Sequence, residues 1–213
     1  MKPYVPLMQV TMGKKRPHLG PLLVRLANEN PEPLVGLEIT THREIIVSFH
    51  RAREAPPNVR EWAFRLTKTN MCSMYEASNW GWNPSSKQKE LSHSSALYLV
   101  AKRQCSEEPC AFVHFRFDMD FGHPVVYCYE IQLESDVQRQ GLGTFLMGIL
   151  EKLALKFRMH KVVLTVFRSN TGALAFYREK LGYRVDSSSP SEDEADYVIL
   201  SKKVQKDKGT TAK

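Results

Sequence analysis

A glycine-containing turn between an apolar strand and an amphipathic helix is the part of this sequence best suited to bind an anion. The turn reads Gln138-Arg139-Gln140-Gly141-Leu142-Gly143. Small residues leave backbone N–H groups uncovered there, and the N-terminus of the following helix adds partial positive charge. The arrangement suits a pyrophosphate. The spacing is neither the Gly-x-Gly-x-x-Gly of a dinucleotide fold nor the Gly-Lys-Ser/Thr ending of a P-loop.

A second pattern lies closer to the C-terminus. It consists of Asn170, Ala173, Phe176-Tyr177 and Leu181-Gly182-Tyr183. Asn170 suits the N-cap of a helix over residues 171–180, and Gly182 suits a left-handed C-terminal cap. The first motif alone could be an ordinary strand, loop and helix with two glycines. Two motifs in this order and at this separation are far more specific than either one.

Together the two motifs resemble those of the GNAT acetyltransferases. Gln138, Gly141 and Gly143 match the acetyl-CoA loop Gln/Arg-x-x-Gly-x-Gly/Ala of that family, which follows its fourth strand. The second pattern is similar to the family signature Asn-x-x-Ala-x-x-Phe-Tyr, followed by Gly-Phe/Tyr. The resemblance implies acetyl-CoA as cosubstrate. It also implies an α+β, three-layer fold in which helices flank a mixed, mostly antiparallel sheet.

The elements that must position these motifs can be located from hydrophobic period and turn residues. We expect strands over 44–49, 96–101, 110–118, 161–167 and 197–200, and one that begins at Val125. We expect helices over 22–27, after Pro56-Pro57-Asn58 to near Tyr75, and over 84–91, 145–157 and 171–180. Trp62, Leu66 and Met74 are expected in the core. Three antiparallel strands then run in succession before the glycine turn, joined by turns at 102–109 and 119–124, and a Ser/acidic loop covers 187–196.

Charge divides the chain into three parts. Of the net charge of +7, residues 1–20 carry +4 and residues 201–213 carry +4, which leaves −1 for residues 21–200. We therefore expect a basic disordered extension at 1–20, a GNAT domain at 21–201 and a basic disordered tail at 202–213. Phosphate binding needs clustered cations on the folded surface, so this distribution argues against direct nucleic-acid binding. The basic ends are interpreted as solubilising, with nuclear import as the alternative.

From the composition we expect a protein outside the membrane and the secretory pathway. No apolar run approaches the ~20 residues of a membrane span, and the N-terminus has no secretory core. Cys72, Cys105, Cys110 and Cys128 have no disulfide or metal spacing, so we expect reduced thiols and no metal site. We expect a monomer in the cytoplasm and nucleus.

The resemblance is closer to one branch of the GNAT superfamily, the NatD family of N-alpha-acetyltransferases, over residues 59–201. Segments that resemble NatD include Leu66-Thr67-Lys68-Thr69-Asn70-Met71, Trp80-Gly81-Trp82, His114-Phe115-Arg116-Phe117-Asp118, Tyr127-Cys128-Tyr129-Glu130 and Ser188-Ser189-Pro190-Ser191. This family acetylates the amino terminus of histones that begin Ser-Gly-Arg-Gly. The resemblance therefore implies histone N-terminal peptides as the protein substrate. The Lys-rich amphipathic N-terminal segment associated with the family is not evident here.

The resemblance points to Glu130, Tyr127 and Tyr129 as catalytic residues. An α-amino group has a pKa of about 8, so a base within hydrogen-bond reach, directly or through one water, suffices to deprotonate it. We expect Glu130 to act through water, with a tyrosine placing the amine or protonating the thiolate; which of the three accepts the proton stays open. An ordinary salt bridge is the alternative role of Glu130. Strand alternation puts Tyr127, Tyr129 and Ile131 on one face and Cys128, Glu130 and Gln132 on the other, so joint action requires a bulge or a splayed strand.

The remaining candidate residues are also assigned by resemblance. For acetyl-CoA they are Ile131, Gln132, Leu133, Gln138, Arg139, Gln140, Gly141, Leu142, Gly143, Thr144, Thr165 and Asn170. For the peptide they are Tyr75, Trp80, Asp118, Met119, Asp120, Tyr129 and Tyr197. Two carboxylates at an entrance suit a substrate arginine, although Asp118 and Asp120 could instead cap a turn. Asp120 stands where the relatives usually have Glu, so its side chain is one methylene shorter and reaches less far toward the substrate.

Two other functions remain compatible with the sequence. One is a GNAT enzyme that acetylates lysine side chains or small amines, which would not depend on a free peptide amino terminus. The other is a non-catalytic histone-binding module that keeps the fold. The intact glycine turn together with Tyr127, Tyr129 and Glu130 argues against loss of catalysis. His114 is interpreted as a strand histidine with a structural role.

Overall fold

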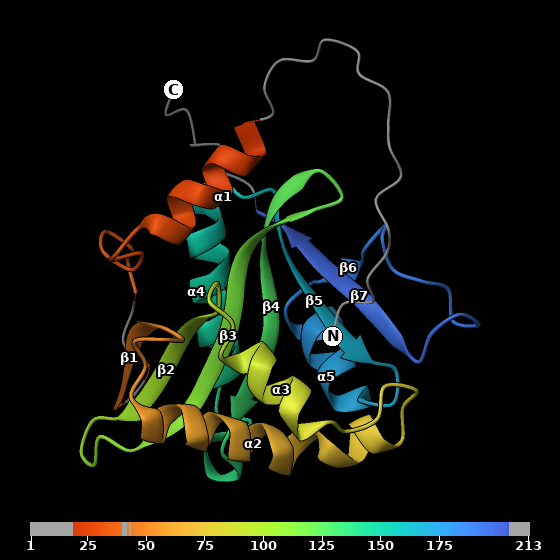
Figure 1. Ribbon diagram of the computed structural model, residues 1–213, viewed down its shortest axis with the longest axis horizontal. Helices are drawn as coiled ribbons and strands as arrows, with labels where there is room; N and C mark the ends of the chain where they lie inside the picture. The colour runs from red at the N-terminus through yellow and green to blue at the C-terminus, as the bar shows by residue number, and fades with distance from the viewer. Residues whose placement is uncertain (1–18, 40–41, 43, 205–213) are drawn as a thin grey trace, which may run out of the picture.

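The computed structural model describes residues 19–39, 42 and 44–204, so the predictions for residues 1–18 and 205–213 lie outside the described part. Within it, one mixed sheet of seven strands has the order β1-β2-β3-β4-β5-β7-β6 (Figure 1). The strands are β1 Ile45–Arg51, β2 Leu97–Arg103, β3 Pro109–Asp120, β4 His123–Leu133, β5 Lys161–Phe167, β6 Arg184–Val185 and β7 Tyr197–Lys203. Neighbouring strands are antiparallel except β4 and β5, which are parallel. This confirms the predicted fold class.

Helices cover both faces of the sheet and make three layers. They are α1 Leu19–Glu29, α2 Pro57–Glu76, α3 Pro84–Leu91, α4 Leu142–Lys156 and α5 Thr171–Ala175. Figure 1 shows α2 and α3 in front of the strands and α4 behind them. Among the described residues, no helix is both long and apolar enough to cross a bilayer.

The alternation of β3 explains why the sheet has two cores. Val113 and Phe115 are fully buried against α4 residues such as Leu146 and Leu150. Phe112, on the opposite face, packs with Ala63 of α2. Successive side chains of a strand point to opposite faces, so one apolar strand supplies both cores.

Several predicted boundaries were wrong. The turn between β3 and β4 is confined to residues 121–122 because the two strands pair as far as Asp120 and His123. The helix predicted over 171–180 is α5 followed by a π-helical turn, Phe176–Lys180. The short strand β6 was not predicted. Met74 lines a groove rather than the core.

The two ends of the predicted domain also shift. The helix α1 begins at Leu19, inside the segment assigned to the basic extension, and β7 continues to Lys203. The folded part therefore extends two residues beyond each predicted boundary, from 21 to 19 and from 201 to 203.

Strand β4 is irregular at its centre, and this irregularity shapes the site. His114 of β3 pairs with Glu130, but the next residue, Phe115, pairs with Cys128. Tyr129 therefore has no partner on β3 and forms a β-bulge. On the other side, the parallel pairing with β5 ends at Cys128 and Leu164, after which the two strands diverge (Figure 1). The expected bulge and splay are both present.

Candidate active site

A groove of about 1740 Å³ follows the divergence of β4 and β5. The predicted site residues that line it are Tyr75, Trp80, Met119, Asp120, Tyr127, Tyr129, Glu130, Ile131, Gln132, Leu133, Gln138, Arg139, Gly141, Gly143, Thr144, Thr165, Asn170 and Tyr197. Asp118, Gln140 and Leu142 are not in the lining. One continuous groove therefore brings together the glycine turn, the bulged strand β4 and the predicted aromatic residues Tyr75, Trp80 and Tyr197.

The glycine turn forms one end of the groove. Gly141 is the N-cap of α4 and has φ of 88°, a conformation that costs little only for glycine. A Cβ on Gly143 would lie 3.2 Å from the ring of Phe176, so a larger residue there would push that ring aside by a few tenths of an ångström. The side chain of Gln138 donates to the carbonyl of Leu133 at 3.0 Å and holds the turn against the end of β4.

The turn fits the diphosphate of a coenzyme A thioester. The hydroxyl of Thr144, in the first turn of α4, is buried, lines the groove and has no hydrogen-bond partner among the described residues. Such an orphaned donor beside the N-terminus of a helix suits a phosphate oxygen. Leu142 is buried in the core, and the side chain of Gln140 donates to the carbonyl of Asp136 at 2.6 Å, so these two residues can reach a ligand in the groove only through their backbone.

Next to the turn lies the gap between β4 and β5. Ile131 and Leu133 still pair with β3, but β5 offers them no ladder partner. An extended pantetheine chain can occupy such an edge as an added strand would. Thr165 lies across the gap, and its hydroxyl is 2.6 Å from that of Tyr127. Asn170 lines the groove and caps α5 by accepting from the N–H of Ala173 at 3.1 Å.

The bulge reverses the expected faces of β4 beyond Tyr129. Cys128 packs in the α4 core, and Ile131 and Leu133 pack against that same core. Glu130 and Gln132 face α2 and α3, where Gln132 accepts from the side chain of Asn70 at 3.0 Å. The prediction that Glu130 and Tyr127 lie on opposite faces was therefore wrong. The extra residue in the bulge brings Tyr127, Tyr129 and Glu130 to the same groove.

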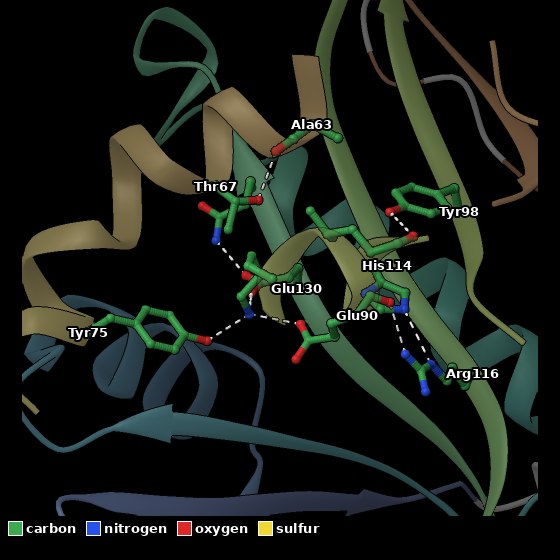
Figure 2. Close-up of polar contacts among 11 residues, drawn as sticks. Ala63, Thr67, Tyr75, Glu90, Tyr98, His114, Arg116 and Glu130 are labelled. Atoms are coloured by element: carbon green, nitrogen blue, oxygen red, sulfur yellow. Dashed lines mark hydrogen bonds and ion pairs between the residues drawn. The ribbon is translucent and has the colours of Figure 1, made fainter. Parts of the chain in front are cut away.

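Glu130 is buried and hydrogen-bonded through both carboxylate oxygens. Its Oε1 accepts from Nζ of Lys87 at 2.8 Å, and its Oε2 accepts from the side-chain amide of Gln132 at 2.8 Å. Lys87 belongs to α3 and also donates to Tyr75 (Figure 2). The salt bridge considered as an alternative role of Glu130 is thus present, inside the groove rather than on an open strand surface. A carboxylate has about four lone-pair positions, so after these two hydrogen bonds Glu130 can still accept one from a water.

Tyr129 and Tyr127 are neutral phenols in this site. Burial raises the pKa of Tyr129 to about 12, and the guanidinium of Arg116, 4.3 Å from the ring centroid, opposes that increase. Burial likewise raises the pKa of Tyr127, against the hydrogen bond with Thr165. Neither phenol is a base near neutral pH, and both can donate a proton.

An aromatic cluster lines the end of the groove away from the glycine turn. Trp80 lies 5.0 Å from Tyr197 and 5.3 Å from Phe167, measured between ring centroids, and Tyr75 lies 5.0 Å from Phe167. These residues come from three separate parts of the chain. The carboxylate of Asp196 accepts from the N–H of Asn79 at 2.8 Å and so ties the loop of Trp80 to the start of β7.

The two predicted substrate acids have different surroundings. Asp120 is buried, lines the groove and lies 3.6 Å from Nζ of Lys161, which also binds Asp186 at 2.5 Å. Asp118 lies on the same face of β3 but outside the lining, and its Oδ1 accepts from the N–H of Met119 at 2.8 Å. This local hydrogen bond corresponds to the turn-capping role that the sequence left open as an alternative to binding a substrate arginine. Of the two acids, Asp120 is the one whose residue lines the groove.

Sequence reasoning missed Lys87, Lys161 and His114 as parts of the site. Lys87 lies in the polar helix α3 and Lys161 at the start of a buried strand, and their roles depend on pairing between distant elements. The helix over 84–91 was predicted, but not the direction in which Lys87 points. His114 is fully buried between the rings of Tyr98 and Tyr129. Burial and the nearby Arg116 hold its pKa well below the usual range, so it is neutral.

Comparison with known proteins agrees with this geometry. The model of the acetyltransferase (GNAT) family matches residues 59–183, more than half of the chain. The chain is similar in structure to the ribosomal-protein-S18-alanine N-acetyltransferase from Escherichia coli, with a TM-score of 0.52 and 18% identity over 79% of this chain and 100% of that chain.

Two further solved structures show the same fold. One is a GNAT family acetyltransferase from Elizabethkingia anophelis with acetyl-CoA bound, at TM-score 0.52 and 19% identity over 76% of this chain and 99% of that chain. The other is the NatC complex bound to Gag peptide and CoA, at TM-score 0.56 and 14% identity over 76% of this chain and 99% of that chain. At these identities the likeness is one of fold. With the family match over residues 59–183, it establishes that the chain belongs to the GNAT family of acetyl-CoA-dependent acetyltransferases.

Proposed function

We propose that this protein is an N-alpha-acetyltransferase that moves acetyl from acetyl-CoA to the free amino terminus of histone-type peptides beginning Ser-Gly-Arg-Gly. The observation that carries the proposal is the bulge at Tyr129, which brings Glu130 to the groove beside the parted edge of β4. A carboxylate there lies next to the position where a thioester between the strands would present its carbonyl. An amine that approaches from the aromatic end meets both.

The chemistry requires a neutral amine, one proton acceptor and one proton donor. The α-amino nitrogen attacks the thioester carbonyl, so a C–N bond forms and the C–S bond breaks. The amine proton passes through water to Glu130, and a neutral tyrosine, Tyr129 or Tyr127, protonates the departing thiolate. The proton held by Glu130 then returns through water to the tyrosinate. Backbone N–H groups around Ile131–Leu133 polarise the carbonyl.

The aromatic end of the groove has features that suit a substrate with a small amino-terminal residue followed by a cation. Tyr75, Trp80 and Tyr197 enclose the space next to Glu130, and Asp120 lies in the groove wall. A substrate arginine can pair with the carboxylate of Asp120, which also faces Lys161. One of the structurally similar enzymes is named as a ribosomal-protein-S18-alanine N-acetyltransferase, and another is bound to a peptide, which supports a peptide acceptor here.

The test is acetyl transfer to three peptides, with the acetylated atom located by mass spectrometry. They are Ser-Gly-Arg-Gly-Lys with a free amino terminus, the same peptide with that terminus blocked, and the free peptide with alanine in place of arginine. We expect acetylation of the first at its α-amine, none of the second, and a reduced rate for the third. Acetylation of the blocked peptide would assign the lysine side chain as acceptor and contradict the proposal.

A further inference from the structure

Lys87 is a buried cation whose contacts all lead to the groove. It comes from α3, and only 6% of its surface is exposed. Its Nζ donates to Oη of Tyr75, Oε1 of Glu90 and Oε1 of Glu130, each at 2.8 Å. Figure 2 shows Tyr75, Glu90 and Glu130 directed toward one another from α2, α3 and β4. Because an ammonium group has three N–H bonds, this site uses all of them.

The surroundings keep Lys87 charged. Burial by itself lowers the pKa of a lysine, but the carboxylates of Glu130 and Glu90 outweigh burial and raise the pKa of Lys87 above its usual range. A lysine with every N–H satisfied by an acceptor does not release a proton near neutral pH. Lys87 is therefore neither a base nor a proton carrier in this groove.

Other titratable groups face Glu130 from the elements packed around it. They are Tyr75 on α2, Glu90 on α3, Tyr98 on β2, His114 and Arg116 on β3, Cys128 and Tyr129 on β4, and Tyr177 after α5. Burial and the charge of Glu130 raise the pKa of Tyr75 to about 12. The guanidinium of Arg116 lies over the ring of Tyr129 and donates to the carbonyl of Glu90. Among the described residues, Lys87 is the cation in ion-pair contact with Glu130.

We propose that Lys87 is a positioning residue for acetyl transfer: its ammonium group holds the carboxylate of Glu130 in the groove through an ion pair, and it orients the hydroxyl of Tyr75. This inference rests on the proposed role of Glu130 as proton acceptor. Removing a cation in contact with a buried carboxylate makes the carboxylate protonate at higher pH. Because Tyr75 accepts from Lys87, its own O–H is free to point into the groove, where it can donate to the acceptor.

The first test compares Lys87→Met with Lys89→Met in the full chain. Lys89 is exposed on the same helix and provides a matched loss of charge. The readout is kcat against pH at saturating free-amine peptide, because the free α-amine, with a pKa of about 8, would set the acid limb of kcat/KM. We expect the acid limb of Lys87→Met to move up by about 1–3 pH units, the usual effect of an opposite charge within 4–6 Å, and that of Lys89→Met to stay in place. A folded Lys87→Met with the acid limb of the wild type would overturn the inference.

A second variant covers the case in which Lys87→Met does not fold. Glu90→Gln keeps the Lys87–Glu130 pair and removes the carboxylate that competes for it. We expect its acid limb to move to lower pH, the opposite direction, because Glu130 is then the one carboxylate among the described residues that is paired with Lys87. A profile that stays unchanged or moves to higher pH would overturn the inference.

A third readout separates this inference from the proposed function. The ¹³C chemical shift of the Glu130 carboxyl carbon, assigned with Glu130→Gln, reports its ionisation without any acceptor peptide. The titration midpoint should move up in Lys87→Met, move down in Glu90→Gln and stay in place in Lys89→Met. If the wild type fails to acetylate the peptide but these midpoints move as stated, the peptide assignment is wrong and the control of Glu130 by Lys87 stands. If the wild type is active and the midpoints do not move, the inference about Lys87 is wrong.

Discussion

The ring of Tyr129 stacks on that of His114, with centroids 5.0 Å apart and planes 20° from parallel. His114 pairs with Glu130 across the two strands, and the bulge places Tyr129, the residue before Glu130, next to His114. A neutral, fully buried imidazole thus supports the side chain at the centre of the proposed active site.

The stack predicts that shape, not basicity, is what His114 contributes. His114→Ala should lower the free energy of unfolding by about 3 kcal/mol, as other large-to-small core changes do, and should also reduce kcat. His114→Phe should keep most of the activity because a ring remains between Tyr98 and Tyr129. Denaturant unfolding and steady-state kinetics check both. A loss in His114→Phe as large as in His114→Ala would show that the imidazole nitrogens matter.

Glu130→Gln should reduce turnover more than peptide affinity. A general base contributes roughly 10²–10⁴-fold to a rate, so kcat should fall within that range while KM changes little. The amide keeps the size of the side chain, and Lys87 keeps Glu90 as a partner. Equal losses in kcat and in peptide affinity would contradict the role of proton acceptor.

The two acids of β3 should act mainly on peptide binding. Hydrogen bonds to charged groups contribute about 1.5–3 kcal/mol, so Asp120→Asn should raise the KM of the arginine peptide roughly ten- to hundredfold. We expect Asp118→Ala to raise it as well. The peptide with alanine in place of arginine is the control, since neither variant should change its KM. An effect of Asp120→Asn alone would assign Asp118 to local capping.

Two glycine-to-alanine changes, one at the N-cap of α4 and one inside that helix, should have opposite effects on stability. Gly141→Ala forces a side chain into φ of 88° and should lower the free energy of unfolding by about 1–2 kcal/mol, with weaker acetyl-CoA binding. Gly148→Ala lies within α4, where a Cβ would meet nothing within 4 Å, and should raise it by about 0.5–1 kcal/mol. Thermal unfolding with and without acetyl-CoA measures both. Destabilisation by Gly148→Ala would be inconsistent with the packing of α4.

Acid should destabilise the fold partly through Asp186. Burial raises the pKa of this carboxyl, but hydrogen bonds from Lys161, Ser201 and Ser188 outweigh burial and hold its pKa well below the usual range. A pKa depressed in the folded state adds stability above the unfolded value of about 3.9, and that stability is lost as the pH falls below it. The free energy of unfolding should therefore decrease below about pH 4, and less steeply in Asp186→Asn. Identical slopes for the two proteins would contradict this assignment.

Much of the site could be predicted because its signals are local. The glycine turn, the cap at Asn170 and the apolar strand of β4 each depend on a few adjacent residues. The sequence also required a bulge near Tyr129 if Tyr129 and Glu130 were to act together, and the pairing of β3 with β4 shows one there. The consequence for the faces of Ile131 and Gln132 did not follow from alternation, because the position of an extra residue is set by cross-strand register.

What the sequence did not predict depends on contacts between distant segments. Lys87 reaches Glu130 across 43 positions of the chain, and nothing in the spacing of α3 specifies that pair. The salt bridge of Asp120 with Lys161 joins strands that are not neighbours in the sequence order. The strand β6 has only two residues, too few for a periodic pattern. Helical period also did not reveal that 176–180 would adopt a π-helical turn.

The most direct test of the central claim is a crystal structure with coenzyme A joined to the amino terminus of a Ser-Gly-Arg-Gly peptide. We predict that the pantetheine chain lies between β4 and β5 and bonds the backbone of Ile131–Leu133. The joined nitrogen should then lie within one water of Glu130, with the arginine facing Asp120. A pantetheine chain bound outside this gap, or a peptide that leaves Glu130 out of reach of its nitrogen, would contradict the account.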